Sequence, residues 1–468
     1  MPRSNLSRCA RILAAVALVL LVSSAPASGG PAANDPVFTQ GLQWGLERIG
    51  APQAWAVGRG AGITIAIVDS GIDLTHEDLA GKIVAQVSCI GAAGDSGKCH
   101  GSAQDDNGHG THVAGIAAAI TNNGRGIAGV APDAKLMAVR VLQNSCTTSG
   151  CSATGTASDV AAGIRWATDH GANVINLSLG GGTLENALGG CSFCSAIDYA
   201  WSKGVIAVIA AGNDSLLPAG FGNEPAIVVT ATTRDNTRAS YSNATSGILS
   251  STRWPLAAPG GEGETNPADC ATGGTPKGVL STYWISGHHN EYACLAGTSM
   301  AAPHVSGALA LLLGKGLKPQ AAIDRLIATA KDLGDPGRDP AFGLGLIDVG
   351  KAMGAPGATT TVPTSSSSST TATTRAGQPT STTAGSATPP SIAGLAPGTV
   401  PGQTSLTTAP ITPLTQPASH TEQAGGALIA VAVGLLLISA SATGGTVWRR
   451  ASAAAPPPPP ARHAAKRH

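Results

Sequence analysis

The stretch "GITIAIVDSGID", residues 62–73, joins a run of β-branched side chains to an acid at its end. The run is apolar on both faces of the predicted strand, which is typical of a strand buried in a parallel sheet. It ends at Asp69, so the strand delivers a carboxylate to the carboxyl edge of the sheet, where sites of open α/β folds usually lie. Asp69 is therefore a candidate functional residue, although turn capping explains this position equally well when it is taken alone.

Similar runs recur along the chain and alternate with helical patterns. Four further stretches predict buried strands: "KLMAVRVL" (135–142), "NVINLSL" (173–179), "VIAVIAAGN" (205–213) and "AIVVTAT" (226–232). Helical patterns fall at 110–121, 157–171, 194–204 and 303–316. From about Asp35 to Met353 the sequence therefore predicts an α/β fold whose parallel strands are joined by crossover helices.

The overall composition limits the classes of partner. The chain has 468 residues with 28 Lys and Arg against 27 Asp and Glu, and this balance gives no electrostatic footprint for nucleic acid. Its residues are 43% hydrophobic but only 3% aromatic, and they include 62 Gly and 31 Pro. Such a composition is typical of a globular core of Ala, Val, Ile and Leu joined to a segment of low complexity.

The first 27 residues have the pattern of a secretory signal peptide. Three arginines precede an apolar core at 12–22, and small residues ending at Ala27 follow it. This order of a basic start, an apolar centre and a small-residue exit argues against the alternative of a buried first helix. We expect cleavage near Ala27, which leaves a short N-terminal segment, 28–34, before a folded domain at 35–353.

The composition changes after the folded domain. Residues 354–424 are rich in Ser, Thr and Pro and lack the apolar content to fold, so we expect a disordered stalk. The uncharged apolar segment 425–448 is long enough to cross a bilayer as a transmembrane helix. The tail 449–468 is basic and Pro-rich, and the positive-inside rule makes it cytoplasmic. The sequence thus predicts a single-pass protein of the cell membrane whose folded domain is extracellular.

Cysteine usage agrees with export. Of the nine cysteines, Cys9 leaves with the signal peptide, and an even number in an exported chain predicts disulfides. Composition does not choose among the possible pairings, and we expect neighbours in the sequence to pair: Cys89 with Cys99, Cys146 with Cys151, Cys191 with Cys194, and Cys270 with Cys294. A zinc site is the alternative, but only Cys191 and Cys194 have the C-x-x-C spacing of zinc ligands.

A serine lies just before the last predicted helix. "GTSMAAPHVSG", residues 297–307, places Ser299 among small residues, and we expect Pro303 in the first helical turn, where its missing N–H has no partner to lose. The N–H groups of a helix N-terminus favour an anion that forms beside the serine oxygen, so this position suits a nucleophile. For an isolated serine, an N-cap with a purely structural role is the commoner explanation.

A nucleophilic serine needs a base, and the base works best when a carboxylate fixes its tautomer. "NGHGTHVAGIAAAI", residues 107–120, places His109 between two glycines at a predicted helix start, where another segment of the chain can approach closely. His112 is the competing base, but it begins the apolar face of this helix and is expected to pack in the core. Asp69, at the end of its strand, is the candidate carboxylate.

In this order, "IVDSGID", "NGHGTHVAGI" and "GTSMAAPHVSG" resemble the three signature segments of the subtilisin-like serine proteases, and the thermitase-type enzymes among them. The resemblance extends over about 35–353 and implies a subtilisin-like three-layer fold with a mainly parallel central sheet and helices on both faces. It implies a serine endopeptidase that acts on proteins or peptides and needs no cofactor for catalysis. By this resemblance Asp69 is the orienting acid, His109 the general base and acid, and Ser299 the nucleophile.

The resemblance also implies residues around the nucleophile. "VIAVIAAGND" is similar to the segment whose Asn side chain donates to the oxyanion, here Asn213, beside the backbone N–H of Ser299. Taken alone, Asn after Gly at a strand end is common turn chemistry. "NLSLGGG" is similar to the edge that pairs with an extended substrate through Ser178, Leu179 and Gly180. A specificity pocket is implied beside the insertion 183–194, with a wall formed by Ala210, Ala211 and Gly212.

A structural Ca²⁺ ion is implied as well. In thermitase-type enzymes the ligands come from an acid in the N-terminal arm, an acid after the catalytic Asp and a loop of the His helix. The matching positions here offer the oxygen ligands that Ca²⁺ prefers, namely the side chains of Asp35, Asp78 and Asn123 and the backbone carbonyls of Ile120, Arg125 and Ile127. Ordinary solvated acids and a turn asparagine are the alternative explanation.

Two other functions fit parts of the sequence. A catalytically silent binding module of the cell envelope would carry a damaged catalytic or oxyanion residue, and none is damaged. A metallohydrolase would use His109 and His112 with Asp105 and Asp106, but the chain has no His-Glu-x-x-His helix. The sequence therefore favours a secreted, membrane-tethered serine endopeptidase.

Overall fold

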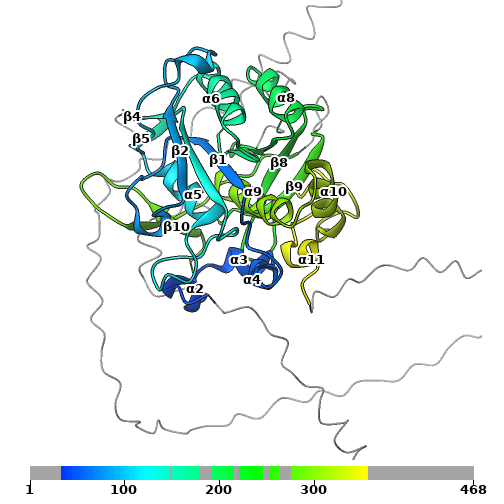
Figure 1. The fold of residues 1–468 in the computed structure, drawn as a ribbon. Coiled ribbons are helices and arrows are strands. Elements are labelled where there is room, and N and C mark those ends of the chain that lie inside the picture. Colours follow the sequence, from blue (N-terminus) through cyan, green and yellow to red (C-terminus); the bar gives the residue numbers. More distant parts are fainter. Residues whose placement is uncertain are drawn as a thin grey trace, which may run out of the picture. The chain divides into compact units, whose positions relative to one another are not determined.

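The computed structural model describes residues 33–147, 150–179, 191–215, 219, 221–245, 252–262 and 276–356. The chain divides into two units, 1–414 and 415–468, and all of the described residues belong to the first (Figure 1). The predicted signal peptide, transmembrane helix and cytoplasmic tail lie outside the described residues, as does the predicted stalk from residue 357 onward.

A parallel sheet forms the middle layer of the fold. Within the described residues, seven strands are ordered β2-β3-β1-β6-β7-β8-β9, and each neighbouring pair is parallel. This order confirms the parallel sheet that the sequence predicts. The strands are β1 (Thr64–Asp69), β2 (Ile83–Ser88), β3 (Lys135–Arg140), β6 (Val174–Leu177), β7 (Ile206–Ala210), β8 (Ala226–Thr232) and β9 (Trp254–Pro259).

Helices cover both faces of the sheet (Figure 1). Along β1, Ile65 and Ile67 pack into the core on one face, whereas Ala66 and Val68 pack into the core on the other. All four are fully buried, which explains why this strand is apolar on both faces. The first face is covered by α5 (His109–Ala118), α9 (Thr298–Gly314), α10 (Pro319–Thr329) and α11 (Val349–Met353), and the second by α6 (Ala157–Asp169) and α8 (Cys194–Ser202).

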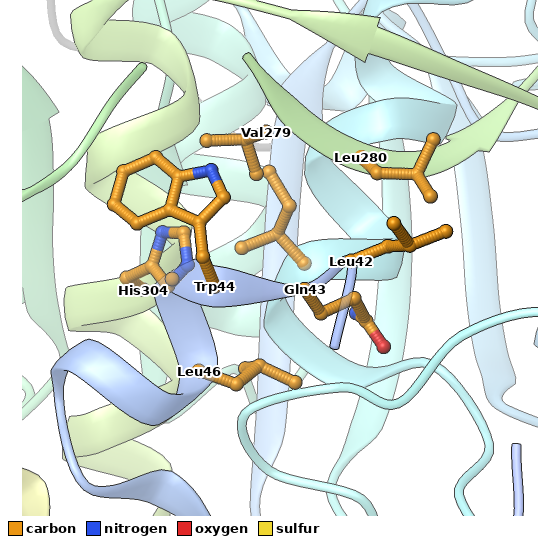
Figure 2. A pocket seen from close by; sticks show the side chains of 9 residues that line it. Leu42, Gln43, Trp44, Leu46, Val279, Leu280 and His304 are labelled. Carbon is orange, nitrogen blue, oxygen red and sulfur yellow. The ribbon is translucent and has the colours of Figure 1, made fainter. Parts of the chain in front are cut away.

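The N-terminal arm packs against the first face through the short helices α2 (Pro36–Thr39), α3 (Trp44–Arg48) and α4 (Ala51–Trp55). Trp44 donates its indole N–H to Gly278 O at 3.0 Å, and Figure 2 shows its ring beside His304 of α9. The small cavity here, about 10 Å³, is at the lower limit of the space that one water molecule needs. Burial lowers the pKa of His304 to about 4 despite its bond to the Met300 carbonyl, so His304 is a neutral core residue.

Two antiparallel hairpins and the disulfides lie outside the sheet. The hairpins are β4 (Gln143–Thr147) with β5 (Gly150–Thr154), and β10 (Val279–Tyr283) with β11 (Glu291–Leu295). Disulfides join Cys89 to Cys99 and Cys191 to Cys194, which confirms the neighbour pairing for these four residues and contradicts the zinc alternative. Cys146 and Cys294 are also disulfide-bonded, and the hairpin register places Cys146 opposite Cys151. Cys270 lies outside the described residues.

Among the described residues, no single helix is both long and apolar enough to cross a bilayer. Helices α9 and α10 taken together have the length and apolar composition of a membrane span, but the chain bends by 120° between them. Most residues of α9 are buried in the core, so this pair is explained by packing within the domain.

Candidate active site

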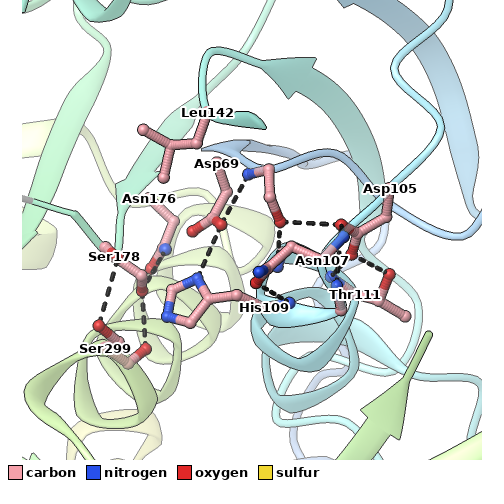
Figure 3. Close-up of polar contacts among 12 residues, drawn as sticks. Asp69, Asp105, Asn107, His109, Thr111, Leu142, Asn176, Ser178 and Ser299 are labelled. Atoms are coloured by element: carbon pink, nitrogen blue, oxygen red, sulfur yellow. Dashed lines mark hydrogen bonds and ion pairs between the residues drawn. The ribbon is translucent and has the colours of Figure 1, made fainter. Parts of the chain in front are cut away.

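The end of β1 and the start of α5 bring two of the predicted site residues together. Asp69 is the last residue of β1, and His109 is the first residue of α5. Asp69 Oδ1 lies 2.7 Å from His109 Nδ1 (Figure 3). Asp69 is fully buried, whereas the His109 side chain is 23% exposed. A carboxylate that accepts the Nδ1 proton leaves Nε2 as the proton acceptor of the ring.

Glycines allow this close approach of helix and strand. A Cβ on Gly110 would lie 2.1 Å from the Gly71 carbonyl oxygen, which follows β1. Gly108 has a φ of 98°, in the left-handed region that favours glycine, and a Cβ there would lie 2.6 Å from the Tyr283 ring. Packing thus explains why glycine flanks His109 on both sides.

The first turn of α9 carries Ser299, as the sequence predicts, but Pro303 lies inside the helix and not in its first turn. A non-proline residue at 303 would donate its N–H to the carbonyl of Ser299, four residues earlier, and proline cannot. Ser178 Oγ donates to that carbonyl instead, at 2.7 Å. The expectation for Pro303 was wrong because a side chain from outside the helix satisfies the carbonyl that the proline releases.

Ser178 also holds the hydroxyl of Ser299. Ser299 Oγ donates to the Ser178 carbonyl at 3.2 Å, so two hydrogen bonds join these serines. In this conformation the hydroxyl is directed at Ser178, while Figure 3 shows the His109 ring pointing toward Ser299. Hydrogen bonds between catalytic groups commonly tighten only when substrate is bound. The structure therefore gathers Asp69, His109 and Ser299 at one place, with the first of the two connecting hydrogen bonds already formed.

Asn213 lies beside the start of α9, which carries Ser299. Its Oδ1 accepts from the N–H of Thr298 at 2.9 Å and from the Thr298 hydroxyl at 2.8 Å. This fixes the amide so that its Nδ2 faces the other way. A Cβ built on Gly297 would lie 3.4 Å from Asn213 Nδ2 and 3.6 Å from the Ser299 N–H nitrogen. Two nitrogen donors thus lie near one small space beside Gly297, and an oxyanion hole needs two such donors.

Burial and charge act on His109 in opposite directions. Burial lowers its pKa, but the charge of Asp69, the hydrogen bond to Asp69 and the charge of Asp105 together outweigh burial. The net effect raises the pKa of His109 above its ordinary value of about 6.5. The site therefore stabilises the imidazolium that forms when His109 accepts a proton.

His112 is a core residue, as expected. It is fully buried, and its Nε2 contacts the carbonyls of Val279 and Ala293 at 3.1 and 3.0 Å. Burial is the largest cause that lowers the pKa of His112, to about 3, so the ring is neutral and Nε2 donates. The described residues hold no group of three or more His, Cys, Asp or Glu side chains that could bind a metal ion, so His109 and His112 are not gathered with Asp105 and Asp106 as the metallohydrolase alternative requires.

A cleft of about 840 Å³ opens at this edge of the sheet, lined by His109, Ser299 and Asn213. Of the residues predicted to contact substrate, Ser178, Leu179, Ala210 and Gly212 line it. Gly180 lies outside the described residues. Ala211 packs in the core beneath α6 and α8, because consecutive residues of an extended chain point to opposite faces. Ala211 is therefore not part of the cleft lining, and its predicted place in a pocket wall stays a prediction.

Phe193 and Ser192, inside the short loop closed by a disulfide, line the cleft, in keeping with the insertion 183–194 that the resemblance places beside the pocket. Two other parts of the cleft wall were not predicted from the sequence. The strand β5 and the residues after it line another side, together with Leu142. Tyr283 and Leu295 come from the hairpin β10–β11. The first hairpin could have been predicted from Cys146 and Cys151, because a disulfide between two such close cysteines favours a tight turn.

The predicted calcium ligands partly come together. Asp35 and Asp78 are both fully buried, and neither is in an ion pair with a described residue. Asn123 links them, because its backbone N–H donates to Asp35 Oδ1 at 3.2 Å and its Nδ2 donates to Asp78 Oδ1 at 2.7 Å. Burial raises the pKa of both acids. Two buried carboxylates without a cationic partner fit a bound divalent cation.

The rest of this ligand set stays a prediction. The N–H of Ile127 donates to Asp78 Oδ2 at 2.8 Å, while its carbonyl and those of Ile120 and Arg125 are the predicted ligands. Within the described part of the chain, no group of three or more His, Cys, Asp or Glu side chains is gathered as a metal site. A cation here would therefore depend on two carboxylates, one amide oxygen and backbone carbonyls.

Comparison with known proteins points to one family. The model of the subtilase family matches residues 60–345. Thermitase from Thermoactinomyces vulgaris is 42% identical over 287 residues, which are 60% of this chain and 86% of thermitase. Subtilisin DY from Bacillus licheniformis is 36% identical over 321 residues, which are 66% of this chain and 98% of subtilisin DY. A solved protease structure from Pseudoalteromonas arctica PAMC 21717 has a TM-score of 0.54 and 31% identity, and the match covers 69% of this chain and 98% of that one.

Proposed function

Because the chain belongs to the subtilase family and is a subtilisin-like serine peptidase, we propose that Asp69, His109 and Ser299 form its catalytic triad. The observation that carries this proposal is the 2.7 Å contact between Asp69 Oδ1 and His109 Nδ1, beside the helix start that holds Ser299. All three residues are intact, which argues against a silent binding module.

The proposed reaction is peptide-bond hydrolysis through an acyl-enzyme. Ser299 Oγ attacks the peptide carbonyl carbon while His109 Nε2 accepts the serine proton. His109 then gives this proton to the leaving amine, and the carbonyl carbon stays bonded to Ser299 as an ester. Water attacks the ester with His109 again as base, which releases the acid product and restores Ser299. Asp69 keeps the Nδ1 proton and stabilises the imidazolium in both halves.

Negative charge develops on the carbonyl oxygen in each half of this reaction. The Nδ2 of Asn213 and the N–H of Ser299 are the proposed donors to that oxygen, supported by their positions beside Gly297. Thr298 holds Asn213 in place before substrate arrives. The donors therefore need little reorganisation when the charge forms.

An Asn213→Ala variant is expected to lose about 10²–10³ in kcat with a much smaller change in KM, because the lost donor acts mainly in the transition state. The magnitude is that of the same change in subtilisin, a member of this family. Steady-state kinetics on a peptide amide substrate measure the loss. An Asn223→Ala variant, at an exposed turn, is the matched control and should keep the parent kcat. A loss below about threefold in Asn213→Ala would contradict the proposed role.

The kcat/KM of the parent is expected to fall as the pH drops through a value above about 6.5. The reason is that only neutral His109 can accept the serine proton, and Asp69 and Asp105 raise its pKa against the effect of burial. A pH profile of kcat/KM measures the acid limb. A limb well below pH 6 would show that His109 is not the titrating base.

The test of endopeptidase function uses the full-length chain and an unfolded protein of known sequence. Mass spectrometry of the fragments should find internal cleavages with newly formed amino and carboxyl termini. A serine-directed phosphonate should abolish the fragments, and calcium-saturated enzyme should be insensitive to a zinc-selective chelator. A folded parent that produces no fragments would refute the proposal.

We propose further that Asp35, Asp78 and Asn123 hold a structural Ca²⁺ ion, supported by the burial of both carboxylates without a cationic partner among the described residues. The ion would tie the N-terminal arm to the loop after α5. It would supply a positive charge that offsets the cost of burying the two acids. It has no part in the bond-breaking steps.

Removal of calcium is expected to lower the midpoint of thermal unfolding by about 5 °C or more, and added Ca²⁺ should restore it. The stabilisation arises because only the folded chain brings these ligands together. Differential scanning calorimetry of a Ser299→Ala background, which avoids self-digestion, measures the shift. Asp35→Asn should reduce the calcium-dependent part of the midpoint, whereas Asp324→Asn, on exposed α10, should not. Equal midpoints with and without Ca²⁺ would refute this site.

The proposed setting is the outer face of a cell membrane, with a signal peptide at 1–27, a stalk at 354–424 and a transmembrane helix at 425–448. The apolar segment followed by Arg449 and Arg450 supports this orientation. Fractionation of expressing cells should find the chain in the membrane, with the peptidase domain accessible to an external biotinylation reagent. Truncation at residue 424 should release it to the medium. Recovery of the full chain in the soluble fraction would contradict the proposed anchor.

A further inference from the structure

We propose that Asp105 is a positioning residue for the general base, because its buried carboxylate joins the strand end that carries Asp69 to the helix start that carries His109. Asp105 lies in the segment just before α5 and is only 1% exposed. It is not part of the cleft lining. The inference rests on the proposed role of His109 as the base.

One oxygen of Asp105 holds both segments. Its Oδ1 accepts from the Ser70 hydroxyl at 2.9 Å and from the N–H groups of Asn107 and Gly108, each at 3.0 Å. Ser70 directly follows Asp69, and its own N–H donates to Asp69 Oδ1 at 2.7 Å. The end of β1 and the loop that leads into α5 are thus fixed to the same atom.

The other oxygen holds the chain on the far side of His109 (Figure 3). Asp105 Oδ2 accepts from the N–H of Thr111 at 3.0 Å and from its hydroxyl at 2.6 Å. The N–H of Gly110 donates to Ser70 Oγ at 3.0 Å, and Ser70 in turn donates to Asp105. Backbone groups before and after His109 are therefore tied to Asp105 directly or through Ser70.

Among the described residues, no cationic side chain forms an ion pair with Asp105, and the nearby Arg140 pairs with Asp106 instead. The compensation comes from N–H groups at the start of α5, where the helix dipole also favours an anion. Neutral donors do not cancel the negative charge of the Asp105 carboxylate, so this charge still acts on the His109 imidazole and raises its pKa.

Other ionisable groups near His109 can also shift its pKa, so their effects must be distinguished from that of Asp105. They come from every segment packed near the ring: Asp69 from β1, Asp106 from the loop before α5, Arg140 from β3, His112 from α5, Tyr283 from β10, and Asp214 from the segment after β7. Of the carboxylates, Asp69 and Asp105 are the two whose charges raise the pKa of His109. Removal of the Asp105 charge should therefore lower that pKa.

The first test compares Asp105→Asn with Asp106→Asn. The control removes the same charge one residue away, from a side chain that is 37% exposed and bonds to Arg140. Histidine-selective NMR of the full-length chain in a Ser299→Ala background measures the His109 pKa, with a His109→Gln chain to assign the signal. Asp105→Asn should lower this pKa by about half a unit or more, and Asp106→Asn should lower it by less.

Two uncharged changes test the positioning part. Ser70→Ala and Thr111→Val each remove a hydroxyl that bonds to Asp105 without changing any charge. Each should lower kcat by about tenfold, because the base is held less well, while KM and the acid limb of the pH profile stay near the parent values. A matched Thr168→Val change, which removes a buried hydroxyl that bonds to the Ile164 carbonyl within α6 and lies outside this network, should leave kcat unchanged.

Either of two results would overturn the inference. One is an unchanged His109 pKa in folded Asp105→Asn, or an equal shift in Asp106→Asn. The other is parental kcat in both Ser70→Ala and Thr111→Val, and these variants decide the matter if Asp105→Asn does not fold. The NMR titration needs no turnover, so a parent that cleaves nothing would refute the proposed triad and still leave the effect of Asp105 measurable.

Discussion

A Ser299→Ala variant is expected to lose about 10⁶ in kcat, a magnitude taken from the same change in subtilisin, a member of this family. Ser299 is the second residue of α9, and alanine leaves no oxygen there to form the acyl-enzyme. Hydrolysis would then proceed only by direct attack of water. Asn213 and the backbone N–H of residue 299 would still stabilise the oxyanion, so a small rate above the uncatalysed reaction should remain.

The effect on the fold should be small. Ser299 Oγ makes one long hydrogen bond, to the Ser178 carbonyl at 3.2 Å, and the Ser178 hydroxyl still bonds to the backbone of residue 299. Circular dichroism and calorimetry should match the parent. A Ser202→Ala variant, which removes an exposed hydroxyl from α8, is the control and should keep full activity. More than about 1% residual kcat in Ser299→Ala would mean that another group is the nucleophile.

An Asp69→Asn variant is expected to lose about 10⁴ in kcat with little change in KM. Asp69 Oδ1 accepts both the N–H of Ser70 and the Nδ1 proton of His109. If the amide oxygen keeps these bonds, the negative charge that stabilises the imidazolium is lost. If the amide group turns over, its N–H faces Nδ1 and the ring proton moves to Nε2, where it blocks transfer from Ser299. Both outcomes disable the base.

The same variant should also move the acid limb of the pH profile to lower pH. The charge of Asp69 and the hydrogen bond to it raise the pKa of His109, so their loss leaves burial as the stronger influence and lowers it. Asp133→Asn, which removes a half-exposed acid paired with Arg59, is the control for loss of a carboxylate. A loss below about tenfold in Asp69→Asn would contradict the orienting role.

The strands at the centre of the sheet were predictable because both of their faces are buried. β1 and β8 are mostly apolar and buried at nearly every position, and the parallel neighbours on each side explain that pattern. The two edge strands were missed. The first four residues of β2 alternate between partly buried and exposed side chains. β9 contains Pro255 and Pro259, which argue against a central strand but are tolerated at an edge.

The candidate site was predictable where one short motif contains both the reactive side chain and the residues that fix the local backbone. His109 between glycines is such a case, because the glycines indicate that another segment lies close to the helix start. The place of Pro303 was not predictable in this way. The helix starts earlier than the proline rule implies, because Ser178, far away in the sequence, supplies the donor that the proline lacks.

The role of Asp105 was not predictable from the sequence either. The sequence offers an acid four positions before His109, but acids before helices are common caps. Its importance depends on Ser70, which reaches it from the strand that carries Asp69. Contacts between distant segments carry that information, and a single sequence does not display them.

The most direct test of the central claim is covalent labelling of the full-length chain with a fluorophosphonate, followed by peptide mapping. If Ser299 is activated by His109 and Asp69, the label will lie on Ser299, and Ser299→Ala and Asp69→Asn chains that fold like the parent will label at least a thousandfold more slowly, on the order expected for loss of triad function. A folded, calcium-saturated parent that takes no label, or that carries it on another residue, would contradict the triad proposed here.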